Sequence, residues 1–234
     1  MLINEGDRRT PRADLMLACL LALVAGGVNS AGFMAFRFFS ANMTGNVSMA
    51  SELLVAGPFD LALAFLTVVA LFILGAVLAT LLIDHGKRRG WGAVYAMALL
   101  LEAAILSGAG LVSALGVPPS HAVLVVGALS LAMGIQNAAS SRISASRVRT
   151  THVSGAATDL GIELARLLGP VRGREREELR FRLTLHLFTI ASFAFGGMLG
   201  VLGYHSFGSF TFVAFSLPLV GLSGWYARRL TRGQ

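Results

Sequence analysis

Long apolar segments alternate with short polar segments along the whole chain. Six segments are rich in Leu, Ala, Val and Gly, and they cover residues 15–36, 60–83, 92–115, 121–141, 182–203 and 208–229. An α-helix needs about 20 such residues to cross a hydrocarbon core of about 30 Å. The segments lack the alternation of apolar and polar residues that marks the strands of a membrane barrel. The pattern therefore predicts an all-α polytopic membrane protein with six transmembrane helices.

A polar motif follows the first span, and another follows the fourth. The first polar motif is residues 42–46 (Asn-Met-Thr-Gly-Asn), and the second is residues 151–155 (Thr-His-Val-Ser-Gly). Each contains a hydroxyl residue followed by glycine, Thr44-Gly45 and Ser154-Gly155. A hydroxyl oxygen can cap the free N–H groups at the start of a helix, so we expect each motif to open a short helix.

The two short helices are expected over residues 44–56 and 154–168. The first has 13 residues, and at 1.5 Å per residue it is about 20 Å long, too short to cross a bilayer. Each can be a re-entrant half-helix whose N-terminus reaches the middle of the membrane. Each can instead be an amphipathic helix at the membrane surface, stabilised by ion pairs such as Glu163 with Arg166.

The two halves of the chain share this order of elements. Asn29 lies 16 residues before Gly45, and Asn137 lies 18 residues before Gly155. Two repeats of three spans insert in opposite directions, and such inverted repeats place a binding site at their interface near the bilayer midplane. Chance placement of glycine and asparagine is the alternative. The predicted organisation is a single membrane domain, 1–234, with repeats at 15–116 and 117–229 and an arginine-rich segment at 142–182.

Basic residues mark one side of the predicted domain. If both termini lie on the same side, that side holds 18 of the 19 arginine and lysine residues, in the N-terminus, 84–91, 142–182 and the C-terminus. Cytoplasmic segments carry such an excess, so we expect both termini in the cytoplasm. The charged stretch 172–182 is expected to be a solvated cytoplasmic loop.

The composition agrees with a membrane protein and argues against several classes of function. Only 13% of the residues are charged, whereas soluble domains carry about 25%. The net charge of +7 comes from the loops and termini, not from a basic face with aromatic residues, so a nucleic-acid partner is not expected. Cys19 is the only cysteine, and no spacing typical of a metal site, a phosphate loop or a nucleophile–base pair occurs. We expect neither a cofactor nor an enzyme.

The candidate substrate-binding residues come from the two polar motifs and the asparagines before them. They are Asn29, Asn42, Thr44, Gly45, Asn46, Asn137, His152, Ser154 and Gly155. If both short helices begin near midplane, their N-termini direct partial positive charge and free N–H groups at a shared cavity, which suits an anion. Asn29 and Asn137 can instead bond between helices, because an amide in lipid needs a partner.

Carboxylates inside the predicted helices are candidate coupling groups. Glu102 lies near the centre of the third span, where a charged side chain costs about 3 kcal/mol or more on insertion. It can couple transport to protons or bind an ion, or it can be a structural glutamate with a partner in the bundle. Asp159, on the second short helix, is the other candidate.

Small residues favour close helix packing in two spans. They are Gly75 with Ala79 in the second span, and Gly196, Gly197, Gly200 and Gly203 in the fifth. Their small-xxx-small spacing lets helix backbones approach closely. This interpretation is structural and predicts helix crossings at these positions.

The motifs also carry a resemblance to a known family. Residues 42–46, the Gly134-Ile-Gln-Asn137 segment and the run from Arg149 to Gly161 resemble the YoaK family of small bacterial inner-membrane proteins. The resemblance covers about residues 15–229 and implies six spans and a membrane location, but no substrate. In that family an aspartate often stands where this chain has Asn29, which argues against proton or cation coupling through this position.

These observations favour a transporter or channel for a small solute, with an anion as a candidate, and with the site at the repeat interface. The alternative is a non-transporting scaffold or sensor that acts through segment 142–182. The expected partners are the lipid bilayer and a small solute or ion, and a homodimer is compatible with the small size of the chain.

Overall fold

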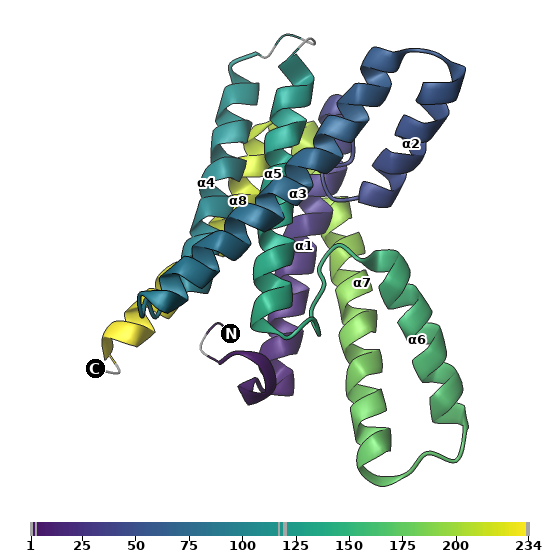
Figure 1. Ribbon diagram of the computed structural model, residues 1–234, viewed down its shortest axis with the longest axis vertical. Helices are drawn as coiled ribbons and strands as arrows, with labels where there is room; N and C mark the ends of the chain where they lie inside the picture. Colours follow the sequence, from purple (N-terminus) through teal and green to yellow (C-terminus); the bar gives the residue numbers. More distant parts are fainter. Residues whose placement is uncertain (1, 3, 117, 119–120, 233–234) are drawn as a thin grey trace.

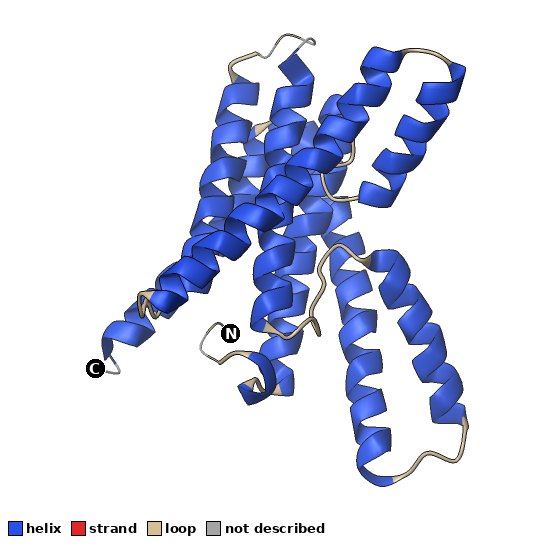
Figure 2. Cartoon of the chain, viewed as in Figure 1, coloured by secondary structure: helices blue, strands red, loops and turns tan. Residues whose placement is uncertain are grey.

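The computed structural model describes residues 2, 4–116, 118 and 121–232 (Figure 1). Within these residues the chain forms helices and loops, without a β-strand (Figure 2). The helices are η1 (Gly6–Arg8), α1 (Pro11–Phe36), α2 (Met43–Ala56), α3 (Phe59–Arg88), α4 (Val94–Ala114), α5 (Ala122–Ile143), α6 (Val153–Leu168), α7 (Gly173–Phe207) and α8 (Phe210–Arg232). The predicted all-α fold is confirmed.

Six of the described helices, α1, α3, α4, α5, α7 and α8, are long and apolar enough to cross a membrane. Each overlaps one predicted span, so the six spans are confirmed. Large apolar side chains such as Leu63, Ile73 and Leu81 on α3 are more than half exposed. Soluble proteins rarely expose such a continuous apolar surface, and in this multi-pass membrane protein it contacts lipid. Residue 117, where the second repeat was predicted to start, lies outside the described residues.

Helices α2 and α6 each form a hairpin with the long helix that follows. α2 packs along α3, and α6 packs along α7. After α1 and again after α5 the chain turns back, so that each short helix begins near the middle of the molecule and runs towards an opposite end (Figure 1). Both short helices begin one residue before the predicted position. This course of the chain favours re-entrant half-helices. It argues against the alternative, in which α2 and α6 lie on the membrane surface.

Close crossings between long helices depend on glycine. α1 packs on α7 and α5 packs on α3, and at these crossings glycines face backbone oxygens of the other helix. The contacts are Gly26 with Phe193, Gly134 with Phe72, Gly75 with Leu131 and Gly196 with Leu23. A Cβ at any of these glycines would collide with the opposite oxygen. The close packing predicted at Gly75 and Gly196 is confirmed.

The same contacts relate the two halves of the chain. Residues 23 and 26 of α1 lie 108 positions before residues 131 and 134 of α5. Residues 72 and 75 of α3 lie 121 positions before residues 193 and 196 of α7. A constant offset for each pair of helices is the relation that a structural repeat produces. Because α2 and α6 run in opposite directions (Figure 1), the arrangement is consistent with the predicted inverted repeat.

Ion pairs gather the N-terminal segment and the ends of α3 and α5 at one end of the molecule. The pairs are Lys87 with Glu5, Arg142 with Asp84, and Arg147 with both Asp7 and Asp14. Burial by itself raises the pKa of the Glu5 carboxyl, but hydrogen bonds from Lys87 and Tyr95 bring it below its ordinary value. The basic segments that the sequence placed on one side of the membrane therefore share one end of the structure (Figure 1).

The charged stretch 172–182 is almost entirely helical, so the loop predicted there is wrong. α7 begins at Gly173 and has 35 residues, which is about 52 Å at 1.5 Å per residue, longer than a hydrocarbon core. Arginine and glutamate are good helix formers, and this part of α7 packs on α6. The predicted pair of Glu163 with Arg166 is also wrong, because Arg166 contacts Glu175 at 2.5 Å and Glu163 faces α7.

Candidate functional site

A cavity of about 810 Å³, named here the central cavity, lies between the N-termini of α2 and α6. Its wall contains seven of the nine predicted substrate-binding residues, namely Asn29, Asn42, Thr44, Gly45, Asn137, His152 and Ser154. Phe72 and Phe193, whose backbone oxygens face Gly134 and Gly26, also line it. The structure thus brings together residues from both halves of the chain at the helix crossings.

The N-cap residues of the two short helices differ in type, but each lies against the glycine three positions further along the chain. Asn42 caps α2, and its Oδ1 accepts a hydrogen bond from the N–H of Gly45 at 3.0 Å. His152 is the N-cap residue of α6, and its ring lies against Gly155. A Cβ at either glycine would collide with the side chain of the N-cap residue. Glycine at the third position of each helix therefore leaves room for that side chain.

Thr44 and Ser154 are not the caps that the sequence predicted. They lie in the first turns of α2 and α6, and both are exposed and line the central cavity. The first N–H groups of a helix have no partner within the helix. Each short helix therefore presents a hydroxyl group and backbone donors to the same space.

Asn29 and Asn137 anchor the turns that lead into the short helices. Asn29 Oδ1 accepts a hydrogen bond from the N–H of Ala41 at 2.9 Å. Asn137 Oδ1 accepts one from Thr151 Oγ1 at 3.0 Å. Ala41 and Thr151 immediately precede the two N-cap residues, so the asparagines set where α2 and α6 begin. Both asparagines also line the central cavity, so a structural bond and a ligand contact are compatible.

Replacing Asn29 by leucine is expected to lower the free energy of unfolding by about 1–3 kcal/mol, because the buried N–H of Ala41 loses its acceptor. Asn29→Asp keeps an oxygen at that position, and we expect a clearly smaller loss. Thermal unfolding of the detergent-purified variants, followed by differential scanning fluorimetry, measures both. Equal losses in the two variants would contradict the anchoring role of the Asn29 oxygen.

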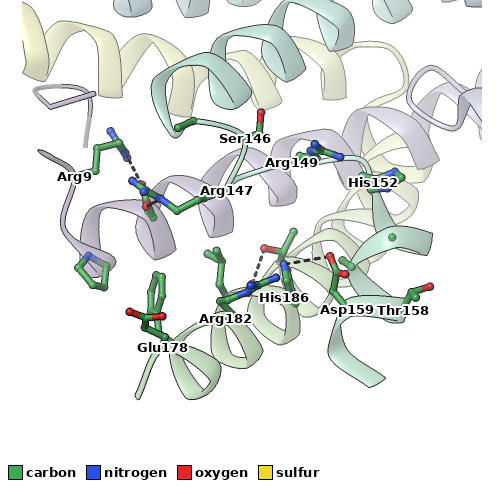
Figure 3. Close-up of a pocket in the computed structure, with 18 residues that line it drawn as sticks. Arg9, Ser146, Arg147, Arg149, His152, Thr158, Asp159, Glu178, Arg182 and His186 are labelled. Atoms are coloured by element: carbon green, nitrogen blue, oxygen red, sulfur yellow. Dashed lines mark hydrogen bonds and ion pairs between the residues drawn. The ribbon is translucent and has the colours of Figure 1, made fainter. Parts of the chain in front are cut away.

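Arg149 is a cationic residue of the site that sequence reasoning did not select as a ligand. It lines the central cavity and also a second cavity of about 860 Å³, named here the side cavity, between the start of α1, the loop 144–152, α6 and α7 (Figure 3). Arg149 and His152 are the residues shared by the two cavities. Within the described residues Arg149 is exposed and makes no ion pair or hydrogen bond. Its guanidinium is available to a ligand.

Two predicted residues line the side cavity and not the central one. They are Gly155 and Asp159. Asp159 Oδ2 is 3.9 Å from Nε2 of His186 on α7. The predicted coupling residue Asp159 therefore lies in a cluster of charged groups between α6 and α7, about two helical turns from the N-terminus of α6.

Two other predicted residues lie away from both cavities. Asn46 is fully buried, and its Nδ2 donates a hydrogen bond to the backbone oxygen of Phe39 at 2.7 Å, which fixes the loop before α2. Glu102 is fully buried in α4, and neither of its oxygens has a hydrogen-bond partner among the described residues. A coupling role for Glu102 stays a prediction.

Comparison with known proteins agrees with the sequence motifs. Residues 17–224 match the family described as "Protein of unknown function (DUF1275)". The UPF0700 transmembrane protein YoaK of Bacillus subtilis (strain 168) is 32% identical over 162 residues, which cover 68% of this chain and 67% of that protein. No solved structure matches the chain. The predicted resemblance to the YoaK family is confirmed.

Proposed function

The chain belongs to the DUF1275 family of proteins, and from this premise we propose that it carries a small anion across the bacterial inner membrane through the central cavity, without covalent chemistry. The family and the six long apolar helices supply the membrane location. The residues that line the central cavity support the proposal that the ligand is an anion.

One observation carries the proposal: two helix N-termini face the same cavity as Arg149, which has no ion pair or hydrogen bond in the described part of the chain. Each helix N-terminus has the effect of about half a positive charge, and its free N–H groups can donate to an anion. The Arg149 guanidinium adds a full charge and planar donors that match a carboxylate or another oxyanion. Among the described residues that line the central cavity none is a carboxylate, so its lining has no negative side chain to offset this positive potential.

The apolar part of the wall favours a small organic anion. Met43, Phe72, Val153 and Phe193 line the cavity together with the polar residues. Ligand sites for small molecules usually combine an apolar wall with a few polar groups that fix orientation. A short carboxylate would place its charge near Arg149 and its carbon chain against these side chains.

The course of the chain supports passage across the membrane. In an inverted repeat, the two hairpins α2–α3 and α6–α7 can open the central cavity to opposite sides in turn. The arginine-rich end is assigned to the cytoplasm by the excess of basic residues. On this assignment the side cavity lies on the cytoplasmic side of the central cavity, and Arg149 and His152 line both cavities.

Uptake by proteoliposomes tests the proposal. Purified protein is reconstituted, and uptake of radiolabelled lactate, inorganic phosphate, sulfate and chloride is compared with uptake by protein-free liposomes. We expect uptake of at least one of these anions to exceed the protein-free control, with lactate first because it is a carboxylate with an apolar end. Folded protein that takes up none of the four would contradict the proposal and favour a scaffold or sensor acting through segment 142–182.

A further inference from the structure

A cluster of charged groups joins α6 to α7 at the wall of the side cavity. Glu163 of α6 is buried, with a side-chain exposure of 3%. Its Oε1 accepts a hydrogen bond from Nε of Arg182 at 3.1 Å, and its Oε2 lies 3.1 Å from Nδ1 of His186. The other ring nitrogen of His186 faces Asp159 at 3.9 Å (Figure 3). The imidazole therefore lies between two carboxylates of the same helix.

The protonation state of His186 determines how many of these contacts are attractive. A neutral imidazole can donate its single N–H to Glu163 at 3.1 Å, whereas the imidazolium also carries a positive charge that attracts Asp159 at 3.9 Å. The imidazolium also makes the cluster electrically neutral, because two carboxylates then face the positive charges of Arg182 and His186. Histidine is the side chain that changes charge most readily between pH of about 5 and 8.

Other charged groups reach the same cavity from every neighbouring element. They are Arg9 from the N-terminal segment, Asp14 from α1, Arg147 and Arg149 from the loop 144–152, and Glu178 from α7. Asp14 pairs with Arg9 and Arg147, and Arg147 also pairs with Asp7, so the charges of the two arginines are offset by two carboxylates. The cavity gives water a route to His186, whose side chain is 16% exposed.

We infer that His186, Glu163 and Asp159 form a proton-binding site that controls how firmly α6 is held against α7 and thereby couples protons to the anion in the central cavity. The proton comes from water in the side cavity, adds to the ring nitrogen that lacks one, and returns to water by the same route. Movement of α6 changes the central cavity because His152 and Ser154, at its N-terminus, are part of the cavity wall. Only the coupling to an anion rests on the proposed function.

Distance measurements between spin labels test the proton site without any anion. In a Cys19→Ser background, Leu168→Cys on α6 and Met198→Cys on α7 place labels on exposed positions, with exposures of 91% and 57%. Double electron–electron resonance is recorded in lipid nanodiscs at pH of about 5 and 8. We expect a narrow distance distribution at the lower pH and a broader or shifted one at the higher pH.

Substitution of His186 tests whether this residue causes the pH dependence of the distances. His186→Gln is expected to give the same distribution at both pH values, and Asp159→Asn, a half-exposed position, a reduced response. The matched control is His205→Gln, an exposed residue in the last turn of the same helix, which should respond like the wild type. A full pH response in His186→Gln overturns the inference. If that variant does not fold, a full response in Asp159→Asn overturns it instead.

Uptake measurements separate the proton site from the transport activity. With the four anions named above, an inward proton gradient should accelerate uptake by the wild type and by His205→Gln, but not by His186→Gln. Acceleration that persists in His186→Gln overturns the coupling. A pH-dependent distance that is lost in His186→Gln, found in a protein that takes up no anion, supports the proton site while the proposed function fails.

Discussion

Arg149→Gln is expected to reduce anion uptake by proteoliposomes at least about tenfold. A charge-assisted hydrogen bond to an ionised ligand contributes about 1.5–3 kcal/mol, and 1.4 kcal/mol corresponds to about a factor of ten in affinity. Arg149 makes no ion pair or hydrogen bond within the described residues, so the variant should remove a ligand contact without breaking a structural one. Its thermal stability should stay near that of the wild type.

The matched control for Arg149 lies on the same end of the molecule. Arg174→Gln removes one exposed arginine from the start of α7, outside both cavities, so it lowers the net charge by the same amount. Its uptake should equal that of the wild type. Arg149→Lys keeps the charge but loses the planar pair of donors, and we expect an intermediate rate. Equal uptake by Arg149→Gln and Arg174→Gln would mean that Arg149 does not contact the anion.

Gly134→Ala is expected to cause a large loss of stability from a single methyl group. The new Cβ would collide with the backbone oxygen of Phe72, and a backbone atom cannot move aside as a flexible side chain can. Overpacking of this kind costs about 1–3 kcal/mol and sometimes more, which lowers the melting temperature of a chain of this size by about 2–12 °C. The equivalent change Gly26→Ala, against Phe193 in the other half, should be as damaging.

Gly108→Ala is the control for this prediction. Gly108 lies inside α4, and a Cβ there would meet no atom within 4 Å. Because alanine favours a helix over glycine by about 0.5–1 kcal/mol, this variant should melt at or above the wild-type temperature. Differential scanning fluorimetry and size-exclusion chromatography in detergent compare the three variants. A Gly134→Ala protein as stable as Gly108→Ala would show that α3 and α5 do not cross as closely as described.

The sequence predicted most of the fold because the bilayer imposes a simple rule on each span. Apolar segments of about 20 residues become helices wherever they occur, and the polar interruptions at residues 42–46 and 151–155 indicated the two short helices. The stretch 172–182 was misjudged because charge was taken as a sign of a loop. A helix can continue into water when its charged residues favour helix formation and bond to a neighbour, as Arg182 does with Glu163.

The site was predicted in part, and the omissions have a physical cause. Residues within the motifs, such as Thr44 and Ser154, were predicted because the start of a helix can be recognised from the local sequence. Arg149 was not selected because the chain has 19 basic residues, and only the folded arrangement shows which of them carboxylates neutralise. Asn46 was selected for its place in the first motif, but it faces the loop that carries Phe39 and not the cavity.

The most direct test of the account asks whether the N-termini of α2 and α6 share one cavity inside the membrane. Thr44→Cys and Ser154→Cys are made separately in a Cys19→Ser background and labelled with a membrane-impermeant thiol reagent, in intact cells and in inverted membrane vesicles. The account predicts that the two cysteines become accessible together, so that any side from which one is labelled also labels the other, and that a transported anion protects both to a similar extent. Labelling of position 44 only from one side and position 154 only from the other, with no shared protection, would mean two separate surfaces and would contradict the account.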